Sequence, residues 1–301
     1  MSFLYLLENI RCAFLDGFMN IITYLGDEYA FLVLAMVVFW CVDKFQGYYV
    51  LFVGFIGTQL NQLLKVIFRI ERPWILDKNF KPVEGSIGRA DGYSFPSGHT
   101  QSAVGTFGAI ARWTKSNALR IVCVVLFALV GFSRMYLGVH TPKDVLTSLV
   151  IALILVFALY PIMKRAQNNP KVMYALFGVV IAWSFAQVLF MELYPFPADA
   201  NGEELFSATK NAYKLLGAVV GMLIAYIVDK KYINFSTKAV WWAQIIKVVV
   251  GLGITIGLQK LGYTVFGLFC SDMMVRALTY FTMVIFAGCI WPLTFKWYKK
   301  N

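Results

Sequence analysis

Long apolar runs separated by short polar breaks are the feature that most constrains the fold of this chain. After a stretch of mixed polarity at residues 1–25, the runs lie at 29–42, 47–68, 100–113, 119–138, 143–163, 171–191, 211–228, 240–260 and 273–295. About 20 helical residues cross a hydrocarbon core about 30 Å thick, and most of these runs approach that length. They lack the period-two alternation of barrel strands. We therefore predict an all-α, polytopic membrane helical bundle with about nine crossings, preceded by an interfacial helix or a short extra crossing.

Composition supports a membrane protein. Of the 301 residues, 59% are hydrophobic and 14% are charged, whereas soluble proteins carry about 25% charged residues. The net charge of +11 comes from basic residues dispersed at the ends of the apolar runs, which membrane topology explains, so we expect no nucleic-acid partner. The cysteines show no metal-ligand spacing, and we interpret them as free thiols, mostly buried. They are Cys12, Cys41, Cys123, Cys270 and Cys289.

The distribution of basic residues predicts the orientation. Every second polar break is rich in Lys and Arg, from Lys44 to the C-terminal "KWYKKN", whereas "ELYPFPADANGEE" on the opposite side is acidic. The positive-inside rule places the basic side in the cytoplasm. Glu8, Arg11 and Asp16 interrupt the N-terminal apolar run, so we expect no cleavable signal peptide. The expected location is a bacterial plasma membrane, with both histidines on the extracytoplasmic side.

Three short polar stretches fall on that outer side. In the first, "KVIFRIERP", Lys65 and Arg72 are two helical turns apart, so they share one face if the helix persists to Pro73. Arg69 lies on roughly the same side. By itself, this stretch is typical of cations that extend toward the interface from a helix end.

The second stretch, "SFPSGHTQS", precedes a new apolar run. Ser97 and Gly98 leave backbone N–H groups and a helix N-terminus facing an anion. His99 follows at the start of this helix. Considered alone, a histidine in this place is more often a capping or loop residue.

The third stretch is "SRMYLGVHTPKD". Thr141 is a candidate cap for a helix that begins at Pro142. His140 and Asp144 are four residues apart, so the carboxylate can bind one imidazole nitrogen and leave the other as a nucleophile. Arg134 lies near the end of the preceding run, where its guanidinium can bind a phosphate through two nitrogens.

Together the three stretches contain the parts of a phosphoryl-transfer site, and they hold the only two histidines of the chain. They resemble the tripartite signature of the type-2 phosphatidic acid phosphatase family: Lys-x6-Arg-Pro, Pro-Ser-Gly-His and Ser-Arg-x5-His-x3-Asp. The resemblance spans residues 65–144 without departure. It implies a six-helix phosphatase-like core in residues 1–165. Residues 166–301, after the break "KRAQNNPK", would add three to four transmembrane helices.

The resemblance also implies a mechanism. His140 would attack phosphorus while Asp144 orients it, and His99 would protonate the leaving alkoxide and then assist water. The non-bridging oxygens would be bound by Lys65, Arg72, Ser97, Gly98 and Arg134. No metal or other cofactor is expected, because no set of carboxylates accompanies the histidines and the cations oppose a divalent ion.

The sequence leaves the substrate open. A phosphorylated lipid such as phosphatidic acid, phosphatidylglycerol phosphate, undecaprenyl diphosphate or a sphingoid phosphate fits a site in the bilayer. A soluble phosphate ester is the alternative, because the number of crossings is similar to that of the glucose-6-phosphatase branch. Residues 74–93 would cap the site, and Lys78, Lys81 or Arg89 would select the headgroup unless they are simply solvated.

The sequence also admits two other functions. Vanadium haloperoxidases share the signature, but they resemble large soluble proteins. A lipid or solute transporter is favoured only by ionisable groups within apolar runs, Lys247 and Arg276, and by the polar Gln59, Asn61 and Gln62. The C-terminal helices would shape a groove for a lipid tail, mediate dimerisation or carry a separate activity, so a homo-oligomer remains an open alternative.

Overall fold

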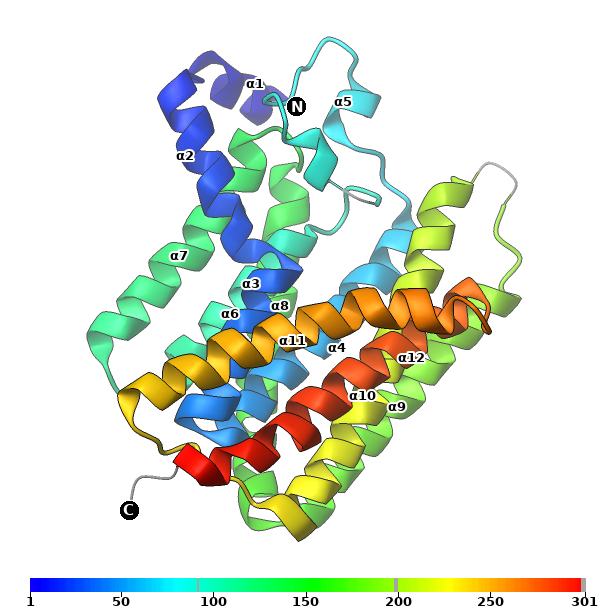
Figure 1. Cartoon of the computed structure of the whole chain (residues 1–301). Coiled ribbons are helices and arrows are strands. Elements are labelled where there is room, and N and C mark those ends of the chain that lie inside the picture. Colours follow the sequence, from blue (N-terminus) through cyan, green and yellow to red (C-terminus); the bar gives the residue numbers. More distant parts are fainter. Residues whose placement is uncertain (91, 198–199, 299–301) are drawn as a thin grey trace. The chain divides into compact units, whose positions relative to one another are not determined.

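The computed structural model describes residues 1–90, 92–197 and 200–298, and every regular element in these ranges is helical (Figure 1). The prediction of an all-α membrane protein is confirmed. The contacts divide the chain into two compact units. The first consists of Met1–Leu34 and Tyr49–Pro161, and the second of Ala35–Tyr48 and Ile162–Asn301. The predicted division into a phosphatase core at residues 1–165 and an extension at residues 166–301 stays a prediction.

The first unit contains the three signature stretches. In it α7 packs against α6, α2 and α1 (Figure 1). The first unit contains only part of α3, α4 and α8, which continue into the second unit. The elements are α1 (Ser2–Asn9), α2 (Ala13–Thr23), η1 (Tyr24–Gly26), α3 (Glu28–Val37), α4 (Lys44–Phe68), α5 (Pro73–Leu76), η3 (Ile87–Arg89), α6 (Gly98–Trp113), α7 (Asn117–Tyr136) and α8 (Pro142–Asn168).

Capping residues set the starts of the two helices that follow the long loop. The Ser97 side chain accepts from Thr100 N at the start of α6, and the Ser116 side chain accepts from Leu119 N at the start of α7. A serine oxygen satisfies one of the first backbone N–H groups, which have no partner within the helix. The second signature stretch is therefore also the start signal of α6.

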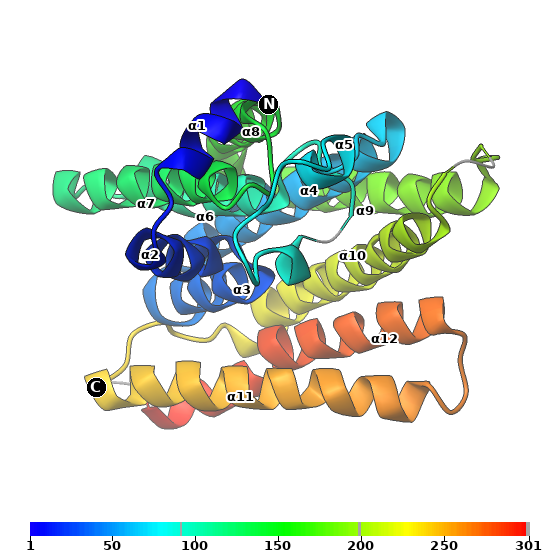
Figure 2. The ribbon, with the colours of Figure 1, turned by 90° about the horizontal axis from the view of Figure 1, so that it is seen from above.

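The second unit is a set of long helices. In it α12 packs against α10 and α11, and α10 also packs against α9 (Figures 1 and 2). A Cβ at Gly217 would lie 2.1 Å from the Ala277 carbonyl oxygen, so the close contact of α10 with α12 requires glycine there. Besides parts of α3, α4 and α8, its elements are η2 (Val38–Val42), α9 (Pro170–Leu193), α10 (Gly202–Val228), η4 (Asp229–Ile233), α11 (Trp241–Phe266), α12 (Asp272–Ile285), η5 (Phe286–Ile290) and η6 (Trp291–Tyr298).

The number of crossings is lower than the nine apolar runs predict. Within the described residues, seven helices are long and apolar enough to span a membrane, and a bent pair, Ala13–Gly26 with Glu28–Val42, raises the number to eight. The run at 29–42 thus joins the N-terminal stretch, which sequence alone left as a separate element. The run at 100–113 forms α6, whose 16 residues are fewer than a hydrocarbon core requires. Both histidines lie outside these candidate spans.

Candidate active site

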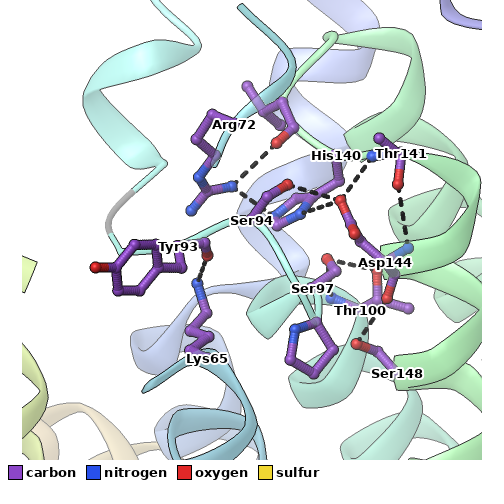
Figure 3. A network of polar contacts seen from close by, with 12 residues as sticks. Lys65, Arg72, Tyr93, Ser94, Ser97, Thr100, His140, Thr141, Asp144 and Ser148 are labelled. Carbon is purple, nitrogen blue, oxygen red and sulfur yellow. Dashed lines mark hydrogen bonds and ion pairs between the residues drawn. The ribbon is translucent and has the colours of Figure 1, made fainter. Parts of the chain in front are cut away.

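His140 is the centre of a buried polar cluster in the first unit (Figure 3). It lies in the connection between α7 and α8, and only 1% of the residue is exposed. Its Nε2 is 2.9 Å from Nη1 of Arg72, and its Nδ1 is 3.5 Å from Oδ2 of Asp144. A guanidinium can only donate, so Nε2 must accept and Nδ1 must carry the ring proton. The geometry therefore gives His140 a lone pair on Nε2.

Asp144 is fixed by donors from two of the signature stretches. Its Oδ2 accepts from Ser94 Oγ at 2.7 Å and from Thr141 N at 2.8 Å (Figure 3). Its backbone oxygen accepts from Ser97 N at 3.2 Å and from Ser148 Oγ at 3.0 Å. Because these bonds hold both the carboxylate and the first turn of α8, the carboxylate stays beside the His140 ring. Ser94 was not among the predicted site residues.

The surroundings of His140 keep its ring neutral. Burial lowers the pKa of His140 well below its ordinary value, and the positive charges of Arg72, Arg134 and Lys65 lower it further. A low-dielectric environment disfavours the charged imidazolium, and nearby cations disfavour it for the same electrostatic reason. The neutral form of this histidine is therefore the resting form.

Arg72 reaches this ring by a route that differs from the predicted one. The helix does not persist to Pro73: α4 ends at Phe68, and Arg69 adopts a left-handed backbone with a φ of 47°. Arg72 is extended (φ −71°, ψ 153°), because the residue before a proline is disfavoured in the α region. Its Nε donates to Gly92 O at 2.9 Å and its Nη1 to Val139 O at 3.0 Å. The side chain is thus aimed by loop carbonyls, not by a helix face.

The other two predicted cations come from helix ends. Lys65, in the last turn of α4, donates to the Tyr93 carbonyl and is 5% exposed (Figure 3). Arg134, in the last turn of α7, is 1% exposed and donates from Nη1 to Thr23 Oγ1 at 2.7 Å. Together with Arg72, these side chains bring three cations from separate segments to the surroundings of His140.

The second signature stretch forms the N-terminus of α6. Ser97 is the capping residue, and its Oγ accepts from both N and Oγ1 of Thr100, at 3.4 and 2.9 Å. Gly98 is the first residue of the helix, and His99 follows in its first turn. The Nε2 of His99 lies 2.6 Å from Oδ1 of Asp27.

Sequence reasoning missed three side chains that touch predicted site residues: Ser94, Thr23 and Asp27. Thr23 and Asp27 lie about 70 or more positions before their partners, so no helical spacing connects them. Ser94 is three residues from the predicted Ser97, and its burial beside Asp144 depends on the path of the loop. In the sequence, these positions are marked only as polar residues in a turn next to an apolar helix. This pattern is too common to identify a site residue.

The headgroup-selecting role of Lys78, Lys81 and Arg89 stays a prediction. Lys78 and Lys81 are exposed, and the side chain of Arg89 lies outside the described residues. In the described part of the chain, no group of three or more His, Cys, Asp or Glu side chains is arranged to hold a metal ion. The arrangement as built offers a neutral nucleophile, an acid–base candidate and cations.

Comparison with known proteins decides the family. Residues 45–168 match the model of the PAP2 superfamily, and residues 213–301 match that of the PAP2 superfamily phosphatase transmembrane extension. The undecaprenyl-diphosphatase BcrC of Bacillus subtilis (strain 168) is 32% identical over 151 residues, which cover 48% of this chain and 74% of that protein. The chain belongs to the PAP2 superfamily.

Two further relatives support this assignment to PAP2. Phosphatidylglycerophosphatase B of Bacillus subtilis (strain 168) is 30% identical over 161 residues, 49% of this chain and 75% of that protein. A probable sphingosine-1-phosphate phosphatase of Dictyostelium discoideum is 28% identical over 165 residues, 50% of this chain and 39% of that protein. No solved structure matches the chain.

The PAP2 match includes all three signature stretches and leaves the N-terminal residues outside it. The predicted resemblance is confirmed, and the protein is a membrane-embedded phosphatase. Thr23 and Asp27 contact Arg134 and His99 from a segment that precedes the match.

Proposed function

We propose that this PAP2 protein hydrolyses a lipid phosphate or diphosphate monoester through a phosphohistidine intermediate, without a metal ion. The observation that carries the proposal is the environment of His140, whose Nε2 faces Arg72 while Nδ1 faces Asp144. An oriented, neutral imidazole beside a cation suits attack on an anionic phosphorus centre. The names of the relatives, which include a lipid diphosphatase and lipid phosphatases, support a lipid substrate.

The reaction has two displacements at phosphorus. In the first, Nε2 of His140 forms a bond to phosphorus as the bond to the ester oxygen breaks, and His99 gives a proton to the departing oxygen. In the second, His99 takes a proton from water, the oxygen of which forms a new bond to phosphorus as the bond to Nε2 breaks. The first displacement releases the lipid alcohol from a monophosphate or the lipid monophosphate from a diphosphate, and the second releases inorganic phosphate in both cases.

The cations would bind the non-bridging oxygens. The charges of Lys65, Arg72 and Arg134 act on His140, and the N-terminus of α6 supplies the backbone of Gly98 and Ser97. In the resting site Ser97 N donates to Asp144 O, so this bond must open before that N–H can bind phosphate. Fixed positive groups in a site with little water stabilise the negative charge of the transition state without having to reorganise. In the resting site Arg72 donates to the attacking nitrogen, so the phosphate must take over this donor as it binds.

Protonation of His99 would follow substrate binding. Burial and the charges of Arg134 and Arg72 together lower the pKa of His99 to about 4, although the contact with Asp27 raises it. A bound phosphate brings negative charge next to the same cations and offsets their effect. His99 then becomes able to hold a proton at the pH at which the leaving group needs one.

We place the protein in a bacterial plasma membrane, with its site on the extracytoplasmic side. The distribution of Lys and Arg supports an extracytoplasmic site, and the relatives from Bacillus support a bacterial plasma membrane. We assign catalysis to residues 1–165 and a structural or tail-binding role to residues 166–301, the latter supported by the transmembrane-extension match. The cations around His140 support catalysis without a divalent ion, because they repel one.

Purified protein in detergent tests this function. Phosphate release is measured with undecaprenyl diphosphate, phosphatidylglycerol phosphate, phosphatidic acid and a sphingoid phosphate, and with glucose 6-phosphate for the soluble alternative. We expect turnover of at least one lipid substrate, unchanged by EDTA, and an acid-labile phosphoenzyme on rapid quenching. Turnover confined to glucose 6-phosphate would replace the lipid assignment, and a strict requirement for a divalent ion would refute the metal-free mechanism.

A further inference from the structure

The turn between α2 and α3, residues 23–27, contacts two signature residues at once. At its start, Thr23 Oγ1 accepts from Arg134 Nη1 at 2.7 Å, and Thr23 is 1% exposed. At its end, Asp27 Oδ1 lies 2.6 Å from His99 Nε2. The turn precedes the PAP2 match, which begins at residue 45.

The backbone of this turn lies directly against His99. A Cβ built on Gly26 would be 2.8 Å from the His99 carbonyl oxygen and 3.0 Å from its Cβ. Real Cβ atoms do not approach backbone oxygens so closely, so only glycine allows the turn to pack here. The contact of Asp27 with His99 is therefore part of a packed interface between the turn and the start of α6.

We propose that the 23–27 turn is a positioning element of the active site. In it, Asp27 orients the His99 ring and favours its protonated form, while Thr23 orients the guanidinium of Arg134. The inference rests on the proposed function for its kinetic consequences, but its central claim about Asp27 and His99 does not require turnover to be measured.

The contact with Asp27 assigns roles to the two ring nitrogens of His99. Since Nε2 faces the carboxylate, Nδ1 is the nitrogen left to exchange a proton with substrate or water. A carboxylate next to Nε2 stabilises the imidazolium, which is the form that donates to a leaving group. Asp27 thus acts on His99 as Asp144 acts on His140, but from a distant part of the sequence.

The other charged groups that face His99 oppose its protonation. They are Arg134 from α7 and Arg72 from the segment before α5, and the neutral His140 lies in the same cluster. Asp27 is the group that counters the two arginines. Without the Asp27 carboxylate, nothing offsets the effect of the two arginines on His99. The protonated His99 that an alkoxide needs as it departs is then lost at a lower pH.

The first test compares Asp27→Asn with wild type, with Asp27→Glu as the conservative variant. Asp16→Asn is the matched control, because Asp16 is a carboxylate on the preceding helix α2 that accepts from Tyr136 Oη of α7 at 2.7 Å rather than from His99. Each is assayed with an alkyl phosphate and with an aryl phosphate, whose leaving group needs little protonation.

For Asp27→Asn we expect kcat on the alkyl phosphate to fall about tenfold or more, as is typical when general-acid catalysis is impaired. Hydrolysis of the aryl phosphate should fall far less, and the basic limb of the alkyl pH profile should move to lower pH. Asp27→Glu should recover part of the loss, and Asp16→Asn should keep the wild-type profile. An unchanged basic limb and an unchanged alkyl-to-aryl ratio in Asp27→Asn would overturn the inference.

The second test is independent of activity. Replacement of His140 by Asn leaves His99 as the only histidine, so isotope-labelled histidine gives one imidazole signal to titrate by NMR. Adding Asp27→Asn to this variant should lower the titration midpoint, whereas adding Asp16→Asn should not. Equal midpoints with and without the Asp27 carboxylate would refute the role of Asp27 whether or not the protein is a phosphatase. Absence of turnover in the wild type would refute only the proposed function.

A third measurement separates the role of Thr23. Thr23→Val removes the acceptor of Arg134 with little change in shape, so it should raise KM severalfold with a smaller effect on kcat. Thr23→Ser restores the hydroxyl and should restore KM. A normal KM in Thr23→Val would show that Arg134 is aimed by its other contacts.

Discussion

Each of the two units contains a buried lysine in a polar cluster, and the two clusters do different work. Lys65, at the end of α4, is 5% exposed, and Lys247, within α11, is 0% exposed. Both donate to backbone carbonyls: Lys65 to Tyr93, and Lys247 to Ser236 and Thr237 at 3.4 and 3.3 Å. Burial and bonding of the amine therefore do not by themselves distinguish a site residue from a structural one.

The cluster around Lys247 stabilises one segment of the second unit. Lys44 Nζ lies 2.7 Å from Asp229 Oδ2, and Asp229 Oδ1 accepts from Phe235 N at 3.1 Å. The amine of Lys247 is also 4.4 Å from the centre of the Phe295 ring. These contacts hold the connection between η4 and α11, so the intramembrane lysine that suggested transport has structural partners.

The cluster around Lys65 converges on a titratable group. Its cations come from α4, from the segment before α5 and from α7, and all of them act on the ring of His140. Several cations that destabilise one imidazolium do not help the fold, whereas they help a neutral nucleophile meet an anion. The two clusters thus differ in the groups near their cations, which are a histidine ring around Lys65 and backbone carbonyls around Lys247. The following predictions test this difference.

Replacement of His140 by Ala should have the largest effect. Without the nucleophile, kcat should fall by about three orders of magnitude or more, as for other covalent catalysts. Phosphate release and trapping of the phosphoenzyme measure the loss, with the elution profile in detergent as a check on folding. Activity within tenfold of wild type would remove His140 from the role of nucleophile.

Replacement of His99 by Ala should depend on the leaving group. Alkyl phosphate hydrolysis should fall about 100-fold, within the usual range for loss of a general acid. An activated aryl phosphate should still form the phosphohistidine, which should then accumulate because water is no longer assisted. Equal losses on both substrates would contradict the acid role and indicate a binding role instead.

Replacement of Arg72 by Lys should have an intermediate effect. Lysine keeps the charge but cannot donate at once to Gly92 O, Val139 O and the His140 ring. We expect kcat/KM to fall about tenfold to 100-fold, comparable to loss of an oriented electrostatic donor. A wild-type value would show that charge alone is sufficient at this position.

The pH profile should show that His140 stays neutral. A base whose pKa is lowered remains unprotonated to a lower pH, so activity persists there and is lost only as the pH falls through the lowered value. The acidic limb of kcat/KM should therefore lie below the ordinary imidazole pKa of about 6.5. A limb at or above that value would contradict the effect of burial and of the cations on the free enzyme.

Replacement of Lys247 by Met should have the smallest effect on activity. The carbonyls of Ser236 and Thr237 lose a donor, so the thermal midpoint should fall by a few degrees while kcat/KM stays within about twofold of wild type. Comparison with Lys65→Met sharpens the contrast, because that variant should lose activity. A large loss of turnover in Lys247→Met would erase the distinction between the clusters.

Local spacing accounts for what could be predicted from the sequence. His140 lies just before α8 and Asp144 lies in its first turn, four residues later, so the geometry of this pair follows from the third signature stretch alone. The apolar runs predicted most helices for the same reason, since their length and period are local properties. The shared helix face of Lys65 and Arg72 depends on a helix that persists to Pro73. The helix ends at Phe68 instead, and Pro73 carries the signal that Arg72 is extended.

Long-range contacts account for most of what could not be predicted. Thr23 and Asp27 contact their partners because α2 packs against α7 and η1 packs against α6 and α7. Likewise Ser94 reaches Asp144 through the course of a loop that lacks helical periodicity. Such contacts depend on tertiary packing, which no motif spacing within a single sequence records.

Arg11 gives the loop that carries His140, the proposed nucleophile, a second anchor. Its guanidinium donates to the Tyr136 carbonyl at 3.2 and 3.1 Å and also to the Lys81 carbonyl, while Arg72 holds Val139 from another side. The loop therefore loses its conformational entropy when the protein folds and not when substrate arrives. Binding energy that would otherwise restrain a mobile loop remains for the phosphate itself.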